Sequence, residues 1–95
     1  MTRNYEGLFI IEPDAASARF DQVKTALAQD LERYKGAITR TKELGQRQLS
    51  YPIGPCSEGF YYLLEFAADS GVINDIRGRY RLNNDVLRFM ITVRE

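Results

Sequence analysis

The chain of 95 residues contains no histidine and a single cysteine, Cys56. Histidine is the commonest general base and a common metal ligand, so its absence removes the usual candidate for both roles. A lone cysteine excludes an internal disulfide and a multi-cysteine metal site. The negative charge of nearby Glu58 also disfavours a reactive thiolate at Cys56. We therefore expect no catalytic residue, no metal site and no bound cofactor.

Long apolar stretches are also missing. Uninterrupted apolar runs such as residues 8–11 are short, whereas a helix that spans a bilayer needs about 20 apolar residues. Residues 1–6 contain no apolar segment of the kind found in signal peptides. We expect a protein without membrane contact, located in the cytoplasm or an organelle matrix. Its length suits one domain over residues 1–95.

The formal net charge is zero, but the charges are unevenly distributed along the chain. Residues 1–32 carry a net charge of −3, residues 33–50 of +4, residues 51–76 of −4 and residues 77–95 of +3. Two basic segments thus alternate with two acidic ones. A folded arrangement of these segments could present a basic surface on a neutral protein.

Hydrophobic periodicity predicts six elements. Strands are expected over residues 5–11, 37–53 with an interruption at 43–45, 60–66 and 86–93, where β-formers predominate. Apolar residues at spacings of three and four predict a helix over residues 16–35, capped by Asp14. A second helix is expected after a cap at Asp69 or Ser70, with its apolar positions at Val72, Ile73, Ile76 and Tyr80.

The order strand, helix, strand, strand, helix, strand predicts an α+β fold of the ferredoxin-like βαββαβ class. In this fold two helices cover one face of a four-stranded antiparallel sheet. The first and third strands are central, and the second and fourth form the edges. Both basic segments therefore fall on or beside the edge strands.

One face of the predicted sheet packs on the helices, and the other is open. If Phe9, Tyr62 and Phe89 point inward, a period of two residues turns their neighbours outward. A contiguous apolar patch on an open face usually marks a partner site. A face half-covered by long side chains and a homodimer contact are the alternatives. The predicted partner-binding residues are Leu8, Ile10, Tyr61, Leu63 and Met90.

Aromatic residues 60–62 invite comparison with the motif on which RNA-recognition domains of similar fold stack bases. The match is poor, because Glu58 stands where that motif has a basic residue and Glu65 where it has an aromatic one. We expect Phe60 and Tyr62 to be core residues. Arginines 77, 79 and 81 near a helix end are equally compatible with a solvated face.

Several motifs in order resemble one family. Residues 43–53 read Glu-Leu-Gly-Gln-Arg-Gln-Leu-Ser-Tyr-Pro-Ile, and residues 81–90 contain the pattern Arg-x-x-x-Asp-Val-Leu-Arg-x-Met. Tyr5-Glu6 begins the first strand, and Leu31 and Tyr34 end the first helix. Together they closely resemble the bacterial-type small-subunit ribosomal protein S-six family, over nearly the whole chain.

The resemblance implies a structural role rather than catalysis, without a small-molecule substrate. The family binds the central domain of small-subunit ribosomal RNA together with ribosomal protein S-eighteen, as a heterodimer. It implies RNA contacts by Arg81 and Arg88, and less directly by Arg3, Arg79 and Arg47. Family partners dock largely beside the sheet, in agreement with the predicted apolar face.

Two other classes remain open from the residues alone. The first is a ligand-binding regulatory domain of the same fold that forms a homodimer through its sheet. The second is a small enzyme of the dimeric α+β type, which the missing histidine disfavours.

Overall fold

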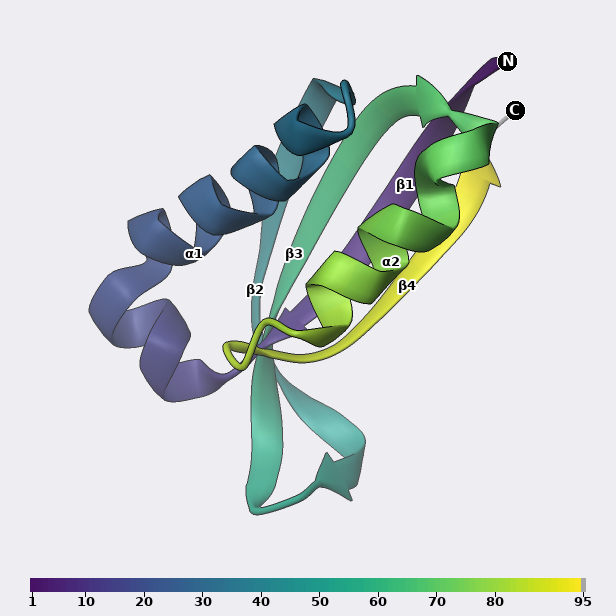
Figure 1. Ribbon diagram of the computed structural model, residues 1–95. Helices are drawn as coiled ribbons and strands as arrows, with labels where there is room; N and C mark the ends of the chain where they lie inside the picture. The colour runs from purple at the N-terminus through teal and green to yellow at the C-terminus, as the bar shows by residue number, and fades with distance from the viewer. Residues whose placement is uncertain (95) are drawn as a thin grey trace.

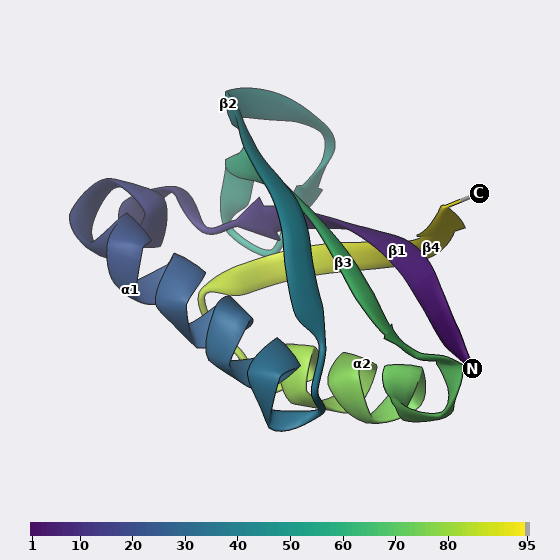
Figure 2. The same cartoon turned by 90° about the horizontal axis from the view of Figure 1, so that it is seen from above.

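The computed structural model describes residues 1–94. Its four strands form one antiparallel sheet in the order β2-β3-β1-β4, and two helices lie on the same side of it (Figures 1 and 2). This arrangement confirms the predicted ferredoxin-like fold, with β1 and β3 in the centre. The elements are β1 Thr2–Ile11, α1 Pro13–Arg33, β2 Ala37–Ile53, β3 Cys56–Asp69, the 3-10 helix η1 Ser70–Val72, α2 Ile73–Arg81 and β4 Val86–Arg94.

Helix α1 begins three residues earlier than predicted, and Asp14 is not its cap. The Glu12 carboxylate accepts hydrogen bonds from the backbone N–H groups of Asp14 at 3.2 Å and Ala15 at 2.9 Å. Pro13 occupies the first turn, where its missing N–H is tolerated. A longer glutamate side chain therefore supplies the cap one residue before the proline, and Asp14 lies in the first turn.

The cap of the second helical segment matches one of the two predicted residues. The Asp69 carboxylate accepts a hydrogen bond of 2.9 Å from the Gly71 N–H at the start of η1. This bond, together with the N-terminal ammonium group at 3.2 Å, holds the pKa of Asp69 below its ordinary value. Asp69 thus ties the N-terminus of β1 to the end of β3.

Strands β2 and β3 form a hairpin that extends beyond the rest of the sheet (Figure 1). The predicted interruption at residues 43–45 is confirmed as a register shift, and Gly45 has a φ of 91° there. Strand β3 is longer than predicted at both ends, because residues 56–59 pair with β2 alone and residues 67–69 pair with the start of β1. Strand β1 pairs with β3 only from Phe60 onward.

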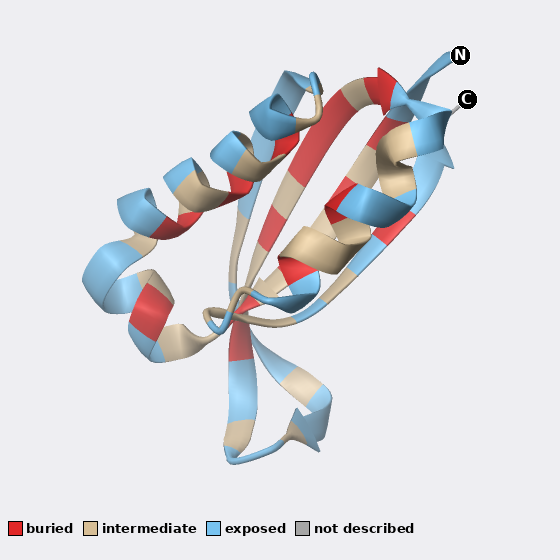
Figure 3. Cartoon of the chain, viewed as in Figure 1, coloured by how far each residue is buried: buried red, intermediate tan, exposed pale blue. Residues whose placement is uncertain are grey.

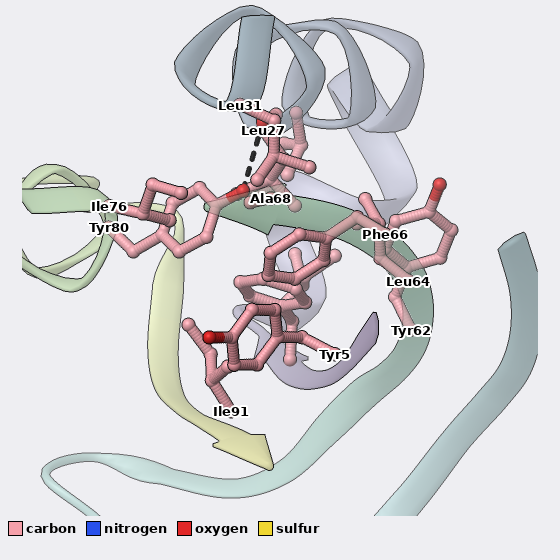
Figure 4. Close-up of a cluster of buried hydrophobic side chains, with 14 residues drawn as sticks. Tyr5, Leu27, Leu31, Tyr62, Leu64, Phe66, Ala68, Ile76, Tyr80 and Ile91 are labelled. Atoms are coloured by element: carbon pink, nitrogen blue, oxygen red, sulfur yellow. Dashed lines mark hydrogen bonds between the residues drawn. The ribbon is translucent and has the colours of Figure 1, made fainter. Parts of the chain in front are cut away.

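The core fills the space between the helices and one face of the sheet (Figures 3 and 4). At its centre the Tyr80 phenol donates a hydrogen bond of 3.1 Å to the Leu27 carbonyl oxygen, which joins α2 to α1. The Phe20 ring lies 4.8 Å from the Phe60 ring and 5.6 Å from the Tyr62 ring, between centroids. Phe60 and Tyr62 therefore pack with the core, as predicted.

The predicted facing of the strands holds with one exception. Phe9, Ile11, Leu64 and Phe66 are at most 1% exposed and lie on the helix side. The alternation along β4 also predicts an inward side chain at Val93, but Val93 is 48% exposed. It lies one residue before the end of β4, and Ile91 is the last buried residue of that strand.

Two glycine substitutions are expected to have opposite effects on stability. A Cβ on buried Gly59 would overlap Ile10 Cγ2, so Gly59→Ala should lower the free energy of unfolding by about 1–3 kcal/mol. A Cβ on Gly78 in α2 meets no atom within 4 Å, so Gly78→Ala should raise it by up to about 1 kcal/mol. Urea denaturation measures both. Equal effects of the two changes would contradict this packing.

Alkaline titration tests the buried phenol. Burial, with a smaller contribution from the Asp30 charge, raises the pKa of Tyr80 above its ordinary value. The contribution of Tyr80 to stability should be constant below the ordinary phenol pKa of about 10 and fall above it, because only the unfolded chain then releases this proton. Tyr80→Phe should make that fall shallower, and should cost about 1 kcal/mol at neutral pH through the lost hydrogen bond. An unchanged pH profile in the variant would refute this role of Tyr80.

Candidate nucleic-acid and partner interface

The five predicted partner-binding residues lie together on the open face of the sheet. Leu8 stands opposite Leu63 on β3 and opposite Met90 on β4. Ile10 stands opposite Tyr61 on β3 and Arg88 on β4. Period two places these two rows side by side on one face. We call this set, without Arg88, the apolar face.

The apolar face is accessible and slightly hollow. Met90 is 58% exposed, and the other four members are half-buried. A depression of about 300 Å³ is lined by Leu8, Ile10, Arg88, Phe89 and Met90. A depression lined by four apolar side chains and one arginine suits a protein partner.

Leu49 also borders this face, although the sequence did not assign it there. A Cβ on Gly59 would lie 3.5 Å from Leu49 Cδ2 and against Ile10, so the three residues meet on the open side of the sheet. The Arg47 guanidinium stands 5.8 Å from the centre of the Tyr61 ring, within range of a cation–π interaction. The only sequence signal for Leu49 was its position in the motif of residues 43–53.

A polar group limits the open face at its other end. Glu65 is 5% exposed and forms ion pairs with Arg40 at 3.6 Å and with Arg94. These contacts connect β3 to both edge strands. Glu6 stands directly opposite Glu65 on β1. The apolar face is therefore confined to the half of the sheet nearer the hairpin.

Arg81 and Arg88, the two principal RNA-binding candidates, line one cavity. It has a volume of about 310 Å³ and lies between α2 and β4. Arg77 lines the same cavity, one helical turn before Arg81. No carboxylate of residues 1–94 lines it, and its remaining lining residues are Tyr80, Val86, Leu87 and Phe89. We call it the arginine cavity.

Sequence reasoning did not propose Arg77 as a site residue. The sequence did contain a pattern that links Arg77 to Arg81, because residues four apart share one face of a helix. Arg77 and Arg81 have this spacing, whereas Arg79 points to another side. The sequence could not show that β4 would bring Arg88 to the same place.

The other three RNA-binding candidates lie elsewhere. Arg79 is held in an ion pair with Asp30 of α1, with 3.4 Å between Nε and the carboxylate oxygen. Arg47 packs over Tyr61 at the opposite edge of the sheet. Arg3 lies on β1 seven residues before Ile10, the partner of Arg88, which is roughly 23 Å at 3.3 Å per residue. The structure thus brings together two of the five.

Residues 1–94 contain neither a metal-binding cluster nor a membrane-spanning helix. No cluster of three or more His, Cys, Asp or Glu side chains in this part of the chain could hold a metal ion. None of the helices described there is both long and apolar enough to cross a membrane.

Comparison with known sequences identifies the family. The sequence model of the family described as ribosomal protein S6 matches residues 4–93. The chain belongs to this family. The resemblance found in the sequence motifs is therefore confirmed.

Individual relatives agree. The chain is 35% identical to the small ribosomal subunit protein bS6 of Thermosynechococcus vestitus, over 100% of this chain and 83% of that protein. It is 37% identical to the protein of the same name from Acidobacterium capsulatum, over 99% of this chain and 66% of the relative.

Solved structures support the fold. A crystal structure of 30S ribosomal protein S6 from Thermotoga maritima has a TM-score of 0.89 and 25% identity, covering 99% of this chain and 89% of that one. An uncharacterized protein of the same organism, 15% identical over 100% of both chains with a TM-score of 0.57, shows the fold alone.

Proposed function

We propose that the chain is a structural constituent of the small ribosomal subunit. It binds the central domain of small-subunit ribosomal RNA together with ribosomal protein S-eighteen, as a heterodimer, in the cytoplasm or an organelle matrix. Membership of the ribosomal protein S6 family over residues 4–93 is the observation that carries the proposal. The role is one of assembly rather than catalysis.

The arrangement of the two surfaces supports this role. The apolar face offers a protein partner a depression that Arg88 helps to line, and Arg88 also lines the arginine cavity. A protein with zero net charge attracts RNA weakly over long range. A basic partner docked on the apolar face would add positive potential next to the arginines.

Zonal sedimentation of a cell extract tests the proposal as a whole. The chain should travel with the small subunit and remain there in moderate salt. Sedimentation as a free homodimer would instead favour a regulatory domain that associates through its sheet, and would overturn the ribosomal assignment.

A pair of neighbouring substitutions tests the partner surface. Leu63→Asp changes a half-buried residue of the apolar face, so the protein should stay folded but lose the heterodimer, and with it RNA binding. Leu64→Asp places an unpaired charge at a position 1% exposed in the core and should unfold the chain. Circular dichroism and co-purification with S-eighteen distinguish the outcomes. A folded Leu63→Asp variant that still forms the heterodimer would remove the apolar face from the proposal.

Arg88 and the salt dependence test the RNA contact. Arg88 is exposed, so Arg88→Ala should change stability by no more than about 0.5 kcal/mol. It should weaken RNA binding of the heterodimer by roughly 1–3 kcal/mol. For three to five arginine contacts, the wild-type log–log slope against salt should be on the order of −2 to −4. Affinity measured from low to moderate salt checks both, and a salt-independent affinity would contradict phosphate contacts.

A further inference from the structure

The arginine cavity is a defined site with three arginines in its lining, rather than a broad basic surface. We propose that Arg77, Arg81 and Arg88 together bind a single phosphate group of the RNA backbone, and that Arg77 is a further RNA-contacting residue. This inference rests on the proposed function for the source of the phosphate. The cavity geometry and the charges around it stand independently of that function.

The position of Arg77 is fixed by the protein itself. Its Nη2 donates a hydrogen bond of 3.1 Å to the backbone carbonyl oxygen of Ile91 on β4. Ile91 is 5% exposed, so this anchor is part of the folded core. A guanidinium group has five N–H donors in a rigid plane, and one such bond leaves the others available. Arg77 therefore loses little side-chain freedom when an anion binds.

The three arginines have no acidic partner in the described part of the chain. Arg19 is paired with Asp85, Arg40 and Arg94 with Glu65, and Arg79 with Asp30. No ion pair of residues 1–94 includes Arg77, Arg81 or Arg88. Three like charges around one cavity repel one another, and a bound anion relieves that repulsion.

The chemistry of the cavity favours phosphate. Arginine forks bind phosphate oxygens in a bidentate manner, and three forks from two elements can surround one tetrahedral group. The lining also includes Val86, Leu87 and Phe89, whose apolar surface strengthens the attraction by excluding water. Arg88 borders the apolar face, so a phosphate in the cavity lies beside a protein partner docked there. RNA bound to the heterodimer supplies such a phosphate.

The first measurement uses inorganic phosphate and the full chain, without partner or RNA. In side-chain NMR spectra at low salt, the Nε–H signals of Arg77, Arg81 and Arg88 should shift together with one dissociation constant. Arg77→Gln should weaken this binding about fivefold or more. The matched control is Arg33→Gln, at the end of α1 and outside the cavity, and it should change nothing. Independent or absent shifts overturn the three-arginine site.

The second measurement uses the heterodimer and RNA. Arg77→Gln should reduce the slope of log affinity against log salt by about 0.7–0.9, the value of one phosphate contact. Arg77→Lys keeps the charge but loses the fork, so the slope should stay while affinity for inorganic phosphate falls. Thermal melting confirms that each variant is folded. If Arg77→Gln leaves RNA affinity and slope unchanged while Arg88→Ala lowers both, the inference fails and the proposed function survives.

The two measurements distinguish a failure of this inference from a failure of the proposed function. If the wild-type heterodimer binds no RNA, the proposed function fails, and so does the assignment of the phosphate to RNA. Phosphate binding at the three arginines with no effect of Arg77→Gln on RNA would show an anion site unrelated to the ribosomal role, which also overturns the inference.

Discussion

The strict two-residue alternation of the central strands is the constraint on which the rest of the structure depends. In β1 and β3 every second side chain enters the core, and Phe9, Tyr62, Leu64 and Phe66 are at most 3% exposed. Their neighbours must then face the other side, which no helix covers (Figure 2). A shift of one residue would exchange the two sets. The same packing that stabilises the core therefore creates the apolar face.

Features that depend on periodicity could be predicted from the sequence. The alternation of Phe9 with Leu8 and Ile10, and the helical spacing of Ile76 and Tyr80, predicted the fold, the central strands and the open face. Each of these patterns lies within one strand or helix, and it is pronounced because one side of that element is buried. The pairing of Leu8 with Leu63 and Met90 then followed from the topology of the fold.

Features that depend on three-dimensional proximity could not be predicted. The cap at Glu12 depends on a long side chain that reaches past Pro13 to the next two backbone N–H groups. The preference for short capping residues predicted Asp14 instead, which was wrong. Leu49 reaches the apolar face because Gly59, which lies between it and Ile10, has no side chain. Arg77 and Arg88 line the same cavity because α2 lies along β4. No sequence spacing encodes these distances.

The net charge of zero conceals an uneven distribution of charge in the folded molecule, in which Arg77, Arg81 and Arg88 line one cavity. Arg79 is neutralised across the helix pair by Asp30, and Arg40 and Arg94 share Glu65 on the sheet.

Each of these pairs joins an accessible arginine to a largely buried carboxylate, and its attraction mainly offsets the cost of burying that carboxylate. Their larger consequence is spatial. They place acidic groups beside other arginines, and no carboxylate in the described part of the chain lines the arginine cavity. Arg88 then lies where two unlike surfaces meet, one apolar and one cationic. A partner that covers the apolar face also removes water from beside Arg88, and a charge with less water around it attracts a phosphate more strongly. In the proposed function, partner docking and RNA binding would therefore be coupled through the Arg88 side chain.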